Sequence, residues 1–291
     1  MFKGGKLKLG IVTGSRSERG ILDSLVRQSD NVLIELGENP LQSVLSAPKV
    51  DWLIVIGDRP EMLQATLGGA KRGFPIAHIH GGDMTDTGYI DESCRHSITR
   101  FAHIHFPATQ KSAENLKKMG EQEFRIHMVG SLAFDGCKTA PFTCNKRVNL
   151  VIYNHCPKDN LNECVREIEK KINSRTGDTI WVESNQDDQG HDEKIRSLVG
   201  SKKIRFVPSM PRDMLLGYLS SPDCLLIGNS SAMYIEAQYF ETQCYHVGTR
   251  NTGREKIEYI PDGLVSQTIV KVLEETKITD ELMTKRVIFN G

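Results

Sequence analysis

The stretch Trp52–Asp83, WLIVIGDRPEMLQATLGGAKRGFPIAHIHGGD, contains an apolar run, an amphipathic segment and a second apolar run. The apolar runs Trp52–Ile56 and Pro75–Ile79 have the length of buried strands, and the segment Pro60–Arg72 between them has helical periodicity. Each run ends at charged or imidazole side chains, and the carboxyl ends of strands in open α/β sheets are where functional groups gather. The stretch therefore predicts a parallel βαβ unit whose strand ends carry chemistry.

The same alternation of apolar runs and amphipathic segments continues on both sides of this stretch. Further strands are expected at Leu7–Thr13, Val32–Leu36, His103–Pro107, Arg125–Val129, Val148–Asn154, Thr179–Glu183, Lys203–Val207, Cys224–Ile227 and Cys244–Val247. Further helices are expected at Arg19–Gln28, Glu92–Arg100, Lys111–Met119, Asn160–Asn173, Asp192–Val199, Arg212–Leu219, Ala232–Phe240 and Gly263–Glu275. This order predicts an α/β fold with doubly wound parallel sheets.

A break in the alternation indicates a domain boundary. Residues 136–147, GCKTAPFTCNKR, fit neither the two-residue period of a strand nor the 3.6-residue period of a helix, and the alternation of strands and helices resumes after them. We therefore expect residues 1–136 to form an N-terminal Rossmann-like domain and residues 147–275 a C-terminal one, with the two facing a cleft. Residues 276–291 are expected to form a tail or helix that packs back on the N-terminal domain.

Charge and composition argue against several classes of protein. The 291 residues carry 37 Lys and Arg against 37 Asp and Glu, so we expect neither a nucleic acid nor a membrane as partner. The longest apolar runs are far shorter than the roughly 20 residues that cross a bilayer, and MFKGGKLKLGIV lacks the apolar core of a signal peptide. The 7 cysteines form no CxxC pair, which argues against a disulfide framework and a thiolate zinc site. We expect a cytoplasmic protein with reduced thiols.

The loop after the first strand is a candidate anion site. Residues 13–20, TGSRSERG, place small residues and Arg16 where a strand turns into a helix. The free N–H groups and the positive dipole end of such a helix attract anions, although the GxxxxGK[ST] spacing of a P-loop is absent. An ordinary βα turn with a capping serine is the alternative.

A second candidate anion site lies nearer the C-terminus. Residues 227–231, IGNSS, precede a helix that carries Glu236, and a later strand ends in VGTR at Arg250. The hydroxyls of Ser230 and Ser231 at a helix N-terminus suit a diphosphate, and the Glu236 carboxylate suits ribose hydroxyls. We interpret the pattern as a nucleotide diphosphate site. The alternative is that one of the serines only caps the helix.

Ionisable side chains gather at the ends of the two central strands of the first half. Mixed carboxylates and imidazoles suit general acid and base chemistry, in particular proton abstraction. The pairs His78/His80 and His103/His105 also allow a metal site, because residues i and i+2 of a strand share a face. The second pair begins its strand and no thiolate joins either pair, so structural histidines are the stronger alternative. The cluster comprises Asp58, His80, Asp83, Asp91, Glu92, Arg95 and His96.

A series of specific motifs extends over nearly the whole chain. In order, they are GDRPEM (57–62), AHIHGGD (77–83), DESCRH (91–96), HFPATQKSAENLKKMGE (105–121), His155, GNSSAMYIEA (228–237) and VGTRNTGRE (247–255). In this order they resemble the UDP-N-acetylglucosamine 2-epimerase family, and especially its hydrolysing branch, which serves sialic acid and related nonulosonate synthesis.

The resemblance implies a glycosyltransferase-B-like fold and an enzyme without a metal or redox cofactor. In the family reaction the C2 proton is removed, UDP leaves from C1, and the glycal is hydrated to a free sugar such as N-acetylmannosamine. Asp58 and Asp91 would handle protons and Arg95 would orient them. His155 would lie near the phosphates. The resemblance also implies a homo-oligomer, either a dimer or a dimer of dimers.

The motifs also indicate which residues would bind the substrate. UDP would be held by Arg16, Ser230, Ser231, Glu236 and Arg250. His80 and Glu92 are the remaining acid/base candidates. The remaining candidates for binding UDP or the sugar are Arg59, Asn185, Ser209, Gly228 and Asn229.

The chain departs from the family pattern in several places. His80 stands where many members have Glu, as in a sub-branch that acts on bacterial nonulosonate precursors. The loop 84–89 has two additional residues, and only residues 29–50 separate the first helix from Trp52, so the N-terminal domain is shortened. The substrate is thus either UDP-N-acetylglucosamine or a 2,4-diacetamido-6-deoxy relative. Alternative functions are a non-hydrolysing epimerase, a glycosyltransferase of the same fold and a non-catalytic UDP-sugar sensor.

Overall fold

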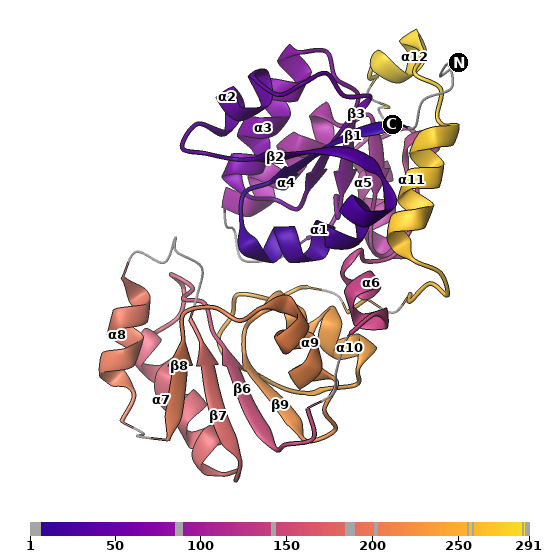
Figure 1. Ribbon diagram of the computed structural model, residues 1–291. Coiled ribbons are helices and arrows are strands. Elements are labelled where there is room, and N and C mark those ends of the chain that lie inside the picture. The colour runs from indigo at the N-terminus through magenta and orange to yellow at the C-terminus, as the bar shows by residue number, and fades with distance from the viewer. Residues whose placement is uncertain are drawn as a thin grey trace. The chain divides into compact units, whose positions relative to one another are not determined.

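The protein consists of two compact units, as the computed structural model shows (Figure 1). Unit 1 contains residues up to Met84, residues 90–135 and the chain from Ile257 onward, and unit 2 contains residues 136–256. Within the described residues, no helix is long and apolar enough to cross a membrane. The structure describes residues 7–84, 90–140, 144–183, 190–200, 203–254, 256–257, 259–286 and 288.

A five-stranded parallel sheet forms the centre of unit 1. Its strands are β1 (Lys8–Thr13), β2 (Asp30–Glu35), β3 (Trp52–Ile56), β4 (Ile76–Ile79) and β5 (Ile104–Phe106). They are ordered β2-β1-β3-β4-β5, so the direction of winding reverses between β1 and β3. The loops after these two strands therefore lie at a topological switch point, which is where open α/β sheets bind ligands.

Helices cover both faces of this sheet because the strand residues alternate between two apolar clusters. The helices are α1 (Arg16–Gln28), α2 (Pro40–Leu45), α3 (Pro60–Lys71), α4 (Ile90–Phe101), α5 (Gln110–Lys118), the 3-10 turn η1 (Glu123–Arg125), α6 (Ala133–Lys138), which begins at the end of this unit, α11 (Val265–Glu275) and α12 (Asp280–Met283). Trp52, Ile54 and Ile56 pack in the cluster that includes α1 and α11. Leu53 and Val55 pack in the cluster that includes α2, α3 and α4.

Unit 2 has its own five-stranded parallel sheet. Its strands are β6 (Val148–Ile152), β7 (Asp178–Val182), β8 (Ile204–Val207), β9 (Cys224–Gly228) and β10 (Gln243–His246). Its helical segments are α7 (Leu161–Asn173), α8 (His191–Leu198), α9 (Arg212–Leu219), the 3-10 turn η2 (Ser231–Met233) and α10 (Glu236–Tyr239). The order β10-β9-β6-β7-β8 reverses between β6 and β9, so the loops after these strands form the switch point. The predicted α/β fold with two doubly wound parallel sheets is confirmed.

The segment Arg125–Val129 is not the strand that its apolar residues predict. It begins in η1 and then makes an isolated bridge to β5. The prediction was wrong because Arg125 is fully buried and donates to the carbonyls of Leu282 at 2.7 Å and Glu281 at 2.9 Å. A buried guanidinium needs several acceptors, and a segment far away in sequence supplies them here.

Two helical segments also differ from the sequence-based expectation. The predicted helix Ala232–Phe240 divides into η2 and α10. The short helix α2 was not predicted, and it packs closely on α3. A Cβ atom on Gly68 of α3 would lie 2.9 Å from the Leu41 carbonyl oxygen and 3.0 Å from the Val44 side chain. Gly68 therefore permits this close helix contact.

The chain beyond residue 256 belongs to unit 1, whereas the sequence assigned residues up to 275 to the second domain. A buried carboxylate holds the start of α11, because the N–H groups of Val265 and Ser266 donate to Asp135 at 2.7 and 2.9 Å. The apolar residues Ile269 and Leu273 pack in the cluster that includes α1. Asp135 satisfies unpaired N–H groups and complements the helix dipole, which fixes the helix on this unit.

Replacing Asp135 with Ala should destabilise unit 1, because two buried N–H groups lose their acceptor at roughly 1–3 kcal/mol for each group. Urea unfolding measures the change in the free energy of unfolding. Asp23→Ala is the control, since Asp23 forms an exposed pair with Arg27 that contributes less than about 1 kcal/mol. Equal losses in the two variants would contradict this role of Asp135.

Candidate active site

A compact ionic cluster joins the end of β3, the loop after β4 and the first two turns of α4. From Nη1, Arg95 donates to Glu92 Oε2 at 2.7 Å and to the Asp83 carbonyl at 2.8 Å. Its Nη2 donates to the Asp58 carboxylate. The structure thus brings Asp58, Glu92 and Arg95 together, and Asp91 precedes Glu92 in the same helical turn.

Burial makes Arg95 depend on these acceptors. Its side chain is only 3% exposed. Burial by itself lowers the pKa of a guanidinium, but Asp58, Asp83 and Glu92 raise the pKa of Arg95 above its ordinary value. The group therefore stays charged and orients two carboxylates by charge-assisted hydrogen bonds. Oriented carboxylates at a strand end can transfer protons to and from a substrate.

The glycine loop after β4 is held against α5. Gly82 has φ +83°, and a Cβ atom there would lie 2.2 Å from the Ser112 carbonyl oxygen, so only glycine fits. Asn115 donates to the Gly82 carbonyl at 2.9 Å, and the Ser112 hydroxyl donates to Asp83 Oδ1 at 2.7 Å. These bonds fix the loop that supplies the Asp83 carbonyl to Arg95.

His80 occupies a left-handed backbone conformation at the end of β4, with φ +62°. Its Nε2 accepts from the Leu132 N–H at 3.3 Å and lies 3.3 Å from the Ser131 hydroxyl oxygen. An accepting Nε2 carries no proton, so in the neutral ring Nδ1 carries it. In this arrangement His80 is a donor at Nδ1 and not a proton acceptor there.

The loop after β1 is already occupied by a carboxylate of its own helix. Glu18 Oε2 accepts from the N–H groups of Gly14 and Ser15, both at 2.9 Å, and Ser15 caps α1 in return. Burial raises the pKa of Glu18. This loop is therefore an ordinary βα turn with a capping serine. The N–H groups that the sequence analysis assigned to an anionic ligand bind the Glu18 carboxylate instead.

The other histidines of the two HxH pairs have structural partners. His78 Nε2 lies 2.8 Å from the Gly57 carbonyl oxygen, His103 Nδ1 accepts from a backbone N–H of β4 at 3.0 Å, and His105 Nε2 lies 3.0 Å from Glu121. Burial lowers the pKa of His78 to about 3 and those of His103 and His105 to about 4. Among the described residues, no group of three or more His, Cys, Asp or Glu is placed to hold a metal ion.

At the switch point of unit 2, Gly228 and Asn229 join two loops. Gly228 has φ +128°, and a Cβ atom would lie 2.2 Å from the Ile152 carbonyl oxygen. The Asn229 amide accepts from the N–H of Asn154 and donates to its carbonyl, both at 2.7 Å. Asn251 donates to the Asn229 carbonyl at 2.6 Å. Asn229 therefore shapes the site by holding the ends of β6 and β9 together.

The segment after Asn229 contains a cap and an ion pair whose carboxylate is buried. The Ser230 hydroxyl accepts from the Ala232 N–H at 3.2 Å, and Ser231 begins η2. Glu236, only 5% exposed, pairs with Arg212 Nη1 at 2.9 Å. Sequence reasoning did not identify Arg212. The available signal was an arginine at the first residue of α9, which follows a strand end on the same edge of the sheet.

The loop after β6 carries His155, whose ring stacks on that of His191 at a centroid distance of 4.2 Å. This loop is tied to the loop after β10, because Asp159 accepts from the Thr249 N–H at 2.9 Å and from its hydroxyl at 2.8 Å. Arg250 follows Thr249 directly. His155 and Arg250 thus come from loops that contact each other.

The other binding candidates are placed as follows. Arg16 begins α1, and Arg59, which precedes α3, forms an ion pair with Glu61. Ser209 lies exposed after β8, and Asn185 lies outside the described residues.

Comparison with known proteins identifies relatives over most of the chain. A family model described as UDP-N-acetylglucosamine 2-epimerase matches residues 23–287. The UDP-N,N'-diacetylbacillosamine 2-epimerase (hydrolyzing) of Legionella pneumophila is 30% identical over 235 residues, which cover 75% of this chain and 62% of that protein. The GDP/UDP-N,N'-diacetylbacillosamine 2-epimerase (hydrolyzing) of Campylobacter jejuni is 28% identical over 249 residues, covering 75% and 61%. The match thus spans about three fifths of the length of these two relatives.

Solved structures share the fold at lower sequence identity. The UDP-N-acetylglucosamine 2-epimerase of Rickettsia bellii matches with a TM-score of 0.73 and 16% identity, covering 93% of this chain and 96% of that chain. The UDP-GlcNAc 2-epimerase of Methanocaldococcus jannaschii in complex with UDP-GlcNAc and UDP matches with a TM-score of 0.68 and 17% identity, covering 96% and 94%. At these identities the likeness concerns the fold alone.

Acid should destabilise unit 1 below about pH 6.5. His78, His103 and His105 stay neutral in the folded state but take up protons near their ordinary pKa of 6.5 when unfolded. Their stabilising contribution to the free energy of unfolding is therefore fully present above pH 6.5 and is lost as the pH falls toward 4. The urea concentration at the unfolding midpoint should fall between pH 7.5 and pH 4.5. The dependence of this midpoint on pH should be weaker in His105→Gln, which lacks one of the three histidines. A midpoint independent of pH in this window would contradict the assignment.

Proposed function

The chain belongs to the UDP-N-acetylglucosamine 2-epimerase family, as its motifs predict, and we propose that it is a hydrolysing 2-epimerase. Its substrate is a UDP-activated N-acetylated amino sugar, and its products are UDP and the free 2-epimer. The observation that carries the proposal is the Arg95 cluster, which orients Asp58 and Glu92 at a strand end. The names of two relatives, both hydrolyzing 2-epimerases, favour this reaction over the non-hydrolysing one.

The proposed chemistry uses carboxylates to move protons at C2 of the sugar. A base removes the C2 proton, the C1–O bond breaks with its electron pair going to the β-phosphate of UDP, and a C1=C2 double bond forms. Water then adds its hydroxyl to C1, and a proton returns to C2 from the opposite face. We assign these proton transfers to Asp58, which Arg95 orients, and to Asp91, which precedes the Arg95 partner Glu92 in the first turn of α4. His80 acts as a hydrogen-bond donor to the sugar.

We assign UDP to unit 2. The supporting features are the loops at its switch point, which carry His155 and the segment Gly228–Ser231. Arg250 supplies a cation from the loop tied to that of His155. Glu236 orients Arg212 through their ion pair, and the carboxylate suits the ribose hydroxyls whereas the guanidinium suits a phosphate.

The sugar is best described as a 2,4-diacetamido-6-deoxy hexose, as in UDP-N,N'-diacetylbacillosamine. Two relatives are named for that substrate, and His80 matches the sub-branch that acts on such precursors. UDP-N-acetylglucosamine is the alternative. We further propose a cytoplasmic location and a homo-oligomer, a dimer or a dimer of dimers.

Incubation with each of the two UDP-sugars should release free UDP and a free 2-epimeric sugar. Phosphorus and proton NMR of the mixture identify the products. A UDP-linked epimer would show the non-hydrolysing reaction, and a requirement for an acceptor would show a glycosyltransferase. UDP binding without turnover of either sugar would show a sensor. Each of these three results contradicts the proposal.

Asp58→Asn should lower turnover by at least about 100-fold, because the amide still accepts from Arg95 but cannot take up a proton. The affinity for UDP, measured by calorimetry, should not change, since UDP is assigned to the other unit. Asp23→Asn at the exposed surface is the control. Turnover near that of the control would exclude Asp58 as a proton acceptor.

A further inference from the structure

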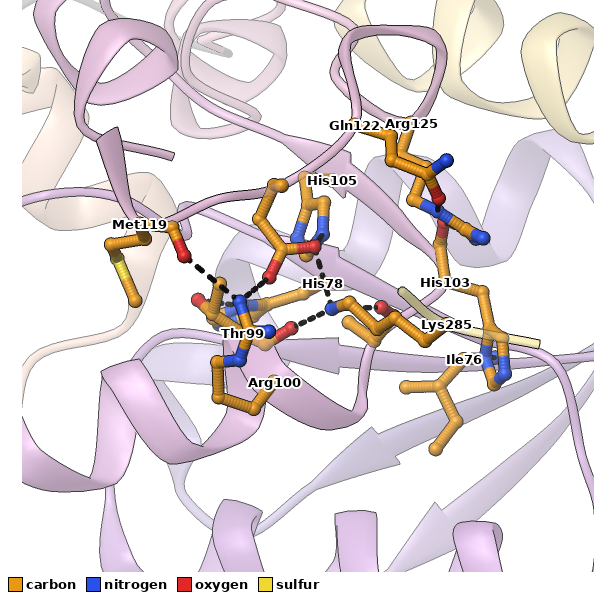
Figure 2. Close-up of polar contacts among 12 residues, drawn as sticks. Ile76, His78, Thr99, Arg100, His103, His105, Met119, Gln122, Arg125 and Lys285 are labelled. Carbon is orange, nitrogen blue, oxygen red and sulfur yellow. Dashed lines mark hydrogen bonds and ion pairs between the residues drawn. The ribbon is translucent and has the colours of Figure 1, made fainter. Parts of the chain in front are cut away.

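The C-terminal segment places a largely buried lysine, whose side chain is 12% exposed, at the end of the helix that carries the acid/base residues. Lys285 Nζ donates to the carbonyls of Ala102, at 2.6 Å, and Thr99, which lie at the C-terminal end of α4 (Figure 2). Asp91 and Glu92 lie in the first turn of this 12-residue helix, and Arg95 lies near its middle, about one turn before Thr99. The last carbonyls of a helix lack internal partners and carry the negative end of its dipole, so a cation there stabilises the helix.

Glu121 anchors this lysine. Glu121 is fully buried and accepts from Lys285 at 2.7 Å, from Arg100 at 2.5 Å and from His105 Nε2, 3.0 Å away (Figure 2). Burial lowers the pKa of Lys285 to about 8, so the ammonium is still mainly protonated at neutral pH. Because Arg100 belongs to α4, two cations tie the last turn of this helix to Glu121.

The segment that carries Lys285 is itself fixed to the same unit. Arg125, fully buried, donates to the Leu282 carbonyl at 2.7 Å and to the His103 carbonyl at 3.1 Å. One guanidinium therefore bridges the C-terminal segment and the start of β5. Lys285 follows Leu282 by three residues, so its ammonium is held in place from its own side as well.

A second contact leads from the end of α4 to the Asp58 loop. The Thr99 hydroxyl lies 3.4 Å from His78 Nδ1, and His78 Nε2 lies 2.8 Å from the carbonyl oxygen of Gly57, the residue before Asp58. Thr99 thus connects the Lys285 contact with the backbone next to a candidate base. Displacement of the helix end would move both partners of the Asp58–Arg95 ion pair.

We propose that Lys285 is a positioning residue, which holds α4 in the register that aligns Arg95 with Asp58. The inference rests on the proposed function only for its effect on turnover. It extends the functional part of the chain to residues 279–286, which none of the active-site motifs includes. Because a displacement of about 1 Å at reacting groups can lower a rate by roughly 100-fold, a contact at the far end of the helix matters for chemistry.

The test compares Lys285→Met with Lys271→Met, a matched control at an exposed lysine that lies 4.0 Å from the exposed Glu275 carboxylate. Hydrogen exchange followed by mass spectrometry measures protection of α4, α3 and unit 2, and steady-state kinetics measures kcat and KM. In Lys285→Met we expect α4 to exchange about tenfold faster and kcat to fall about tenfold, with KM and exchange of α3 unchanged. Lys285→Gln provides the same comparison should the Met variant fail to fold.

The exchange result does not need an active enzyme, so failure of this inference and failure of the proposed function are distinguishable. Unchanged protection of α4 would overturn the inference, and so would equally faster exchange throughout unit 1, because that indicates only general destabilisation. Faster exchange of α4 with an unchanged kcat would also overturn the positioning role. Absence of turnover in the wild-type protein would contradict the proposed function alone.

Discussion

The candidate active site of unit 1 depends on one buried arginine. Arg95 is charged and almost inaccessible, so it is stable only while Asp58, Glu92 and the Asp83 carbonyl surround it. Removing one partner of a buried ion pair commonly costs about 3–5 kcal/mol, because the remaining charge is uncompensated. The end of β3, the glycine loop and the start of α4 must therefore adopt one arrangement, and this arrangement presents the carboxylates.

The two units hold their strand-end loops in different ways. In unit 1 the amides after β1 bind Glu18, so the helix dipole there is already complemented by a carboxylate. In unit 2 the loops are held by amide and hydroxyl contacts, such as those of Asn229 and Thr249, and cationic side chains come from Arg212 and Arg250. This difference supports assigning proton transfer to unit 1 and the diphosphate to unit 2.

The sequence predicts well what depends on local periodicity and poorly what depends on distant contacts. The strand Trp52–Ile56 has the predicted bounds. A strand covered by helices on both faces of a parallel sheet needs apolar residues at consecutive positions, so the apolar run marks where the strand begins and ends. The segment Arg125–Val129 has the same apolar character, but its conformation is decided by carbonyls more than 150 residues away. Arg212 and Lys285 were missed for the same reason, since a lone cation in a sequence does not reveal its partner. The ends of α4 illustrate both cases: its first turn was recognised from a motif, and its C-terminal cap was not.

The central claim is that the Arg95 cluster serves proton abstraction at C2, and isotope exchange tests it most directly. The protein should be incubated with its UDP-sugar in deuterated water, and the released sugar examined by proton NMR. The account predicts a solvent deuterium at C2 of every product molecule, because the original proton leaves before a solvent proton returns from the other face. A released sugar that keeps its original C2 proton would contradict it.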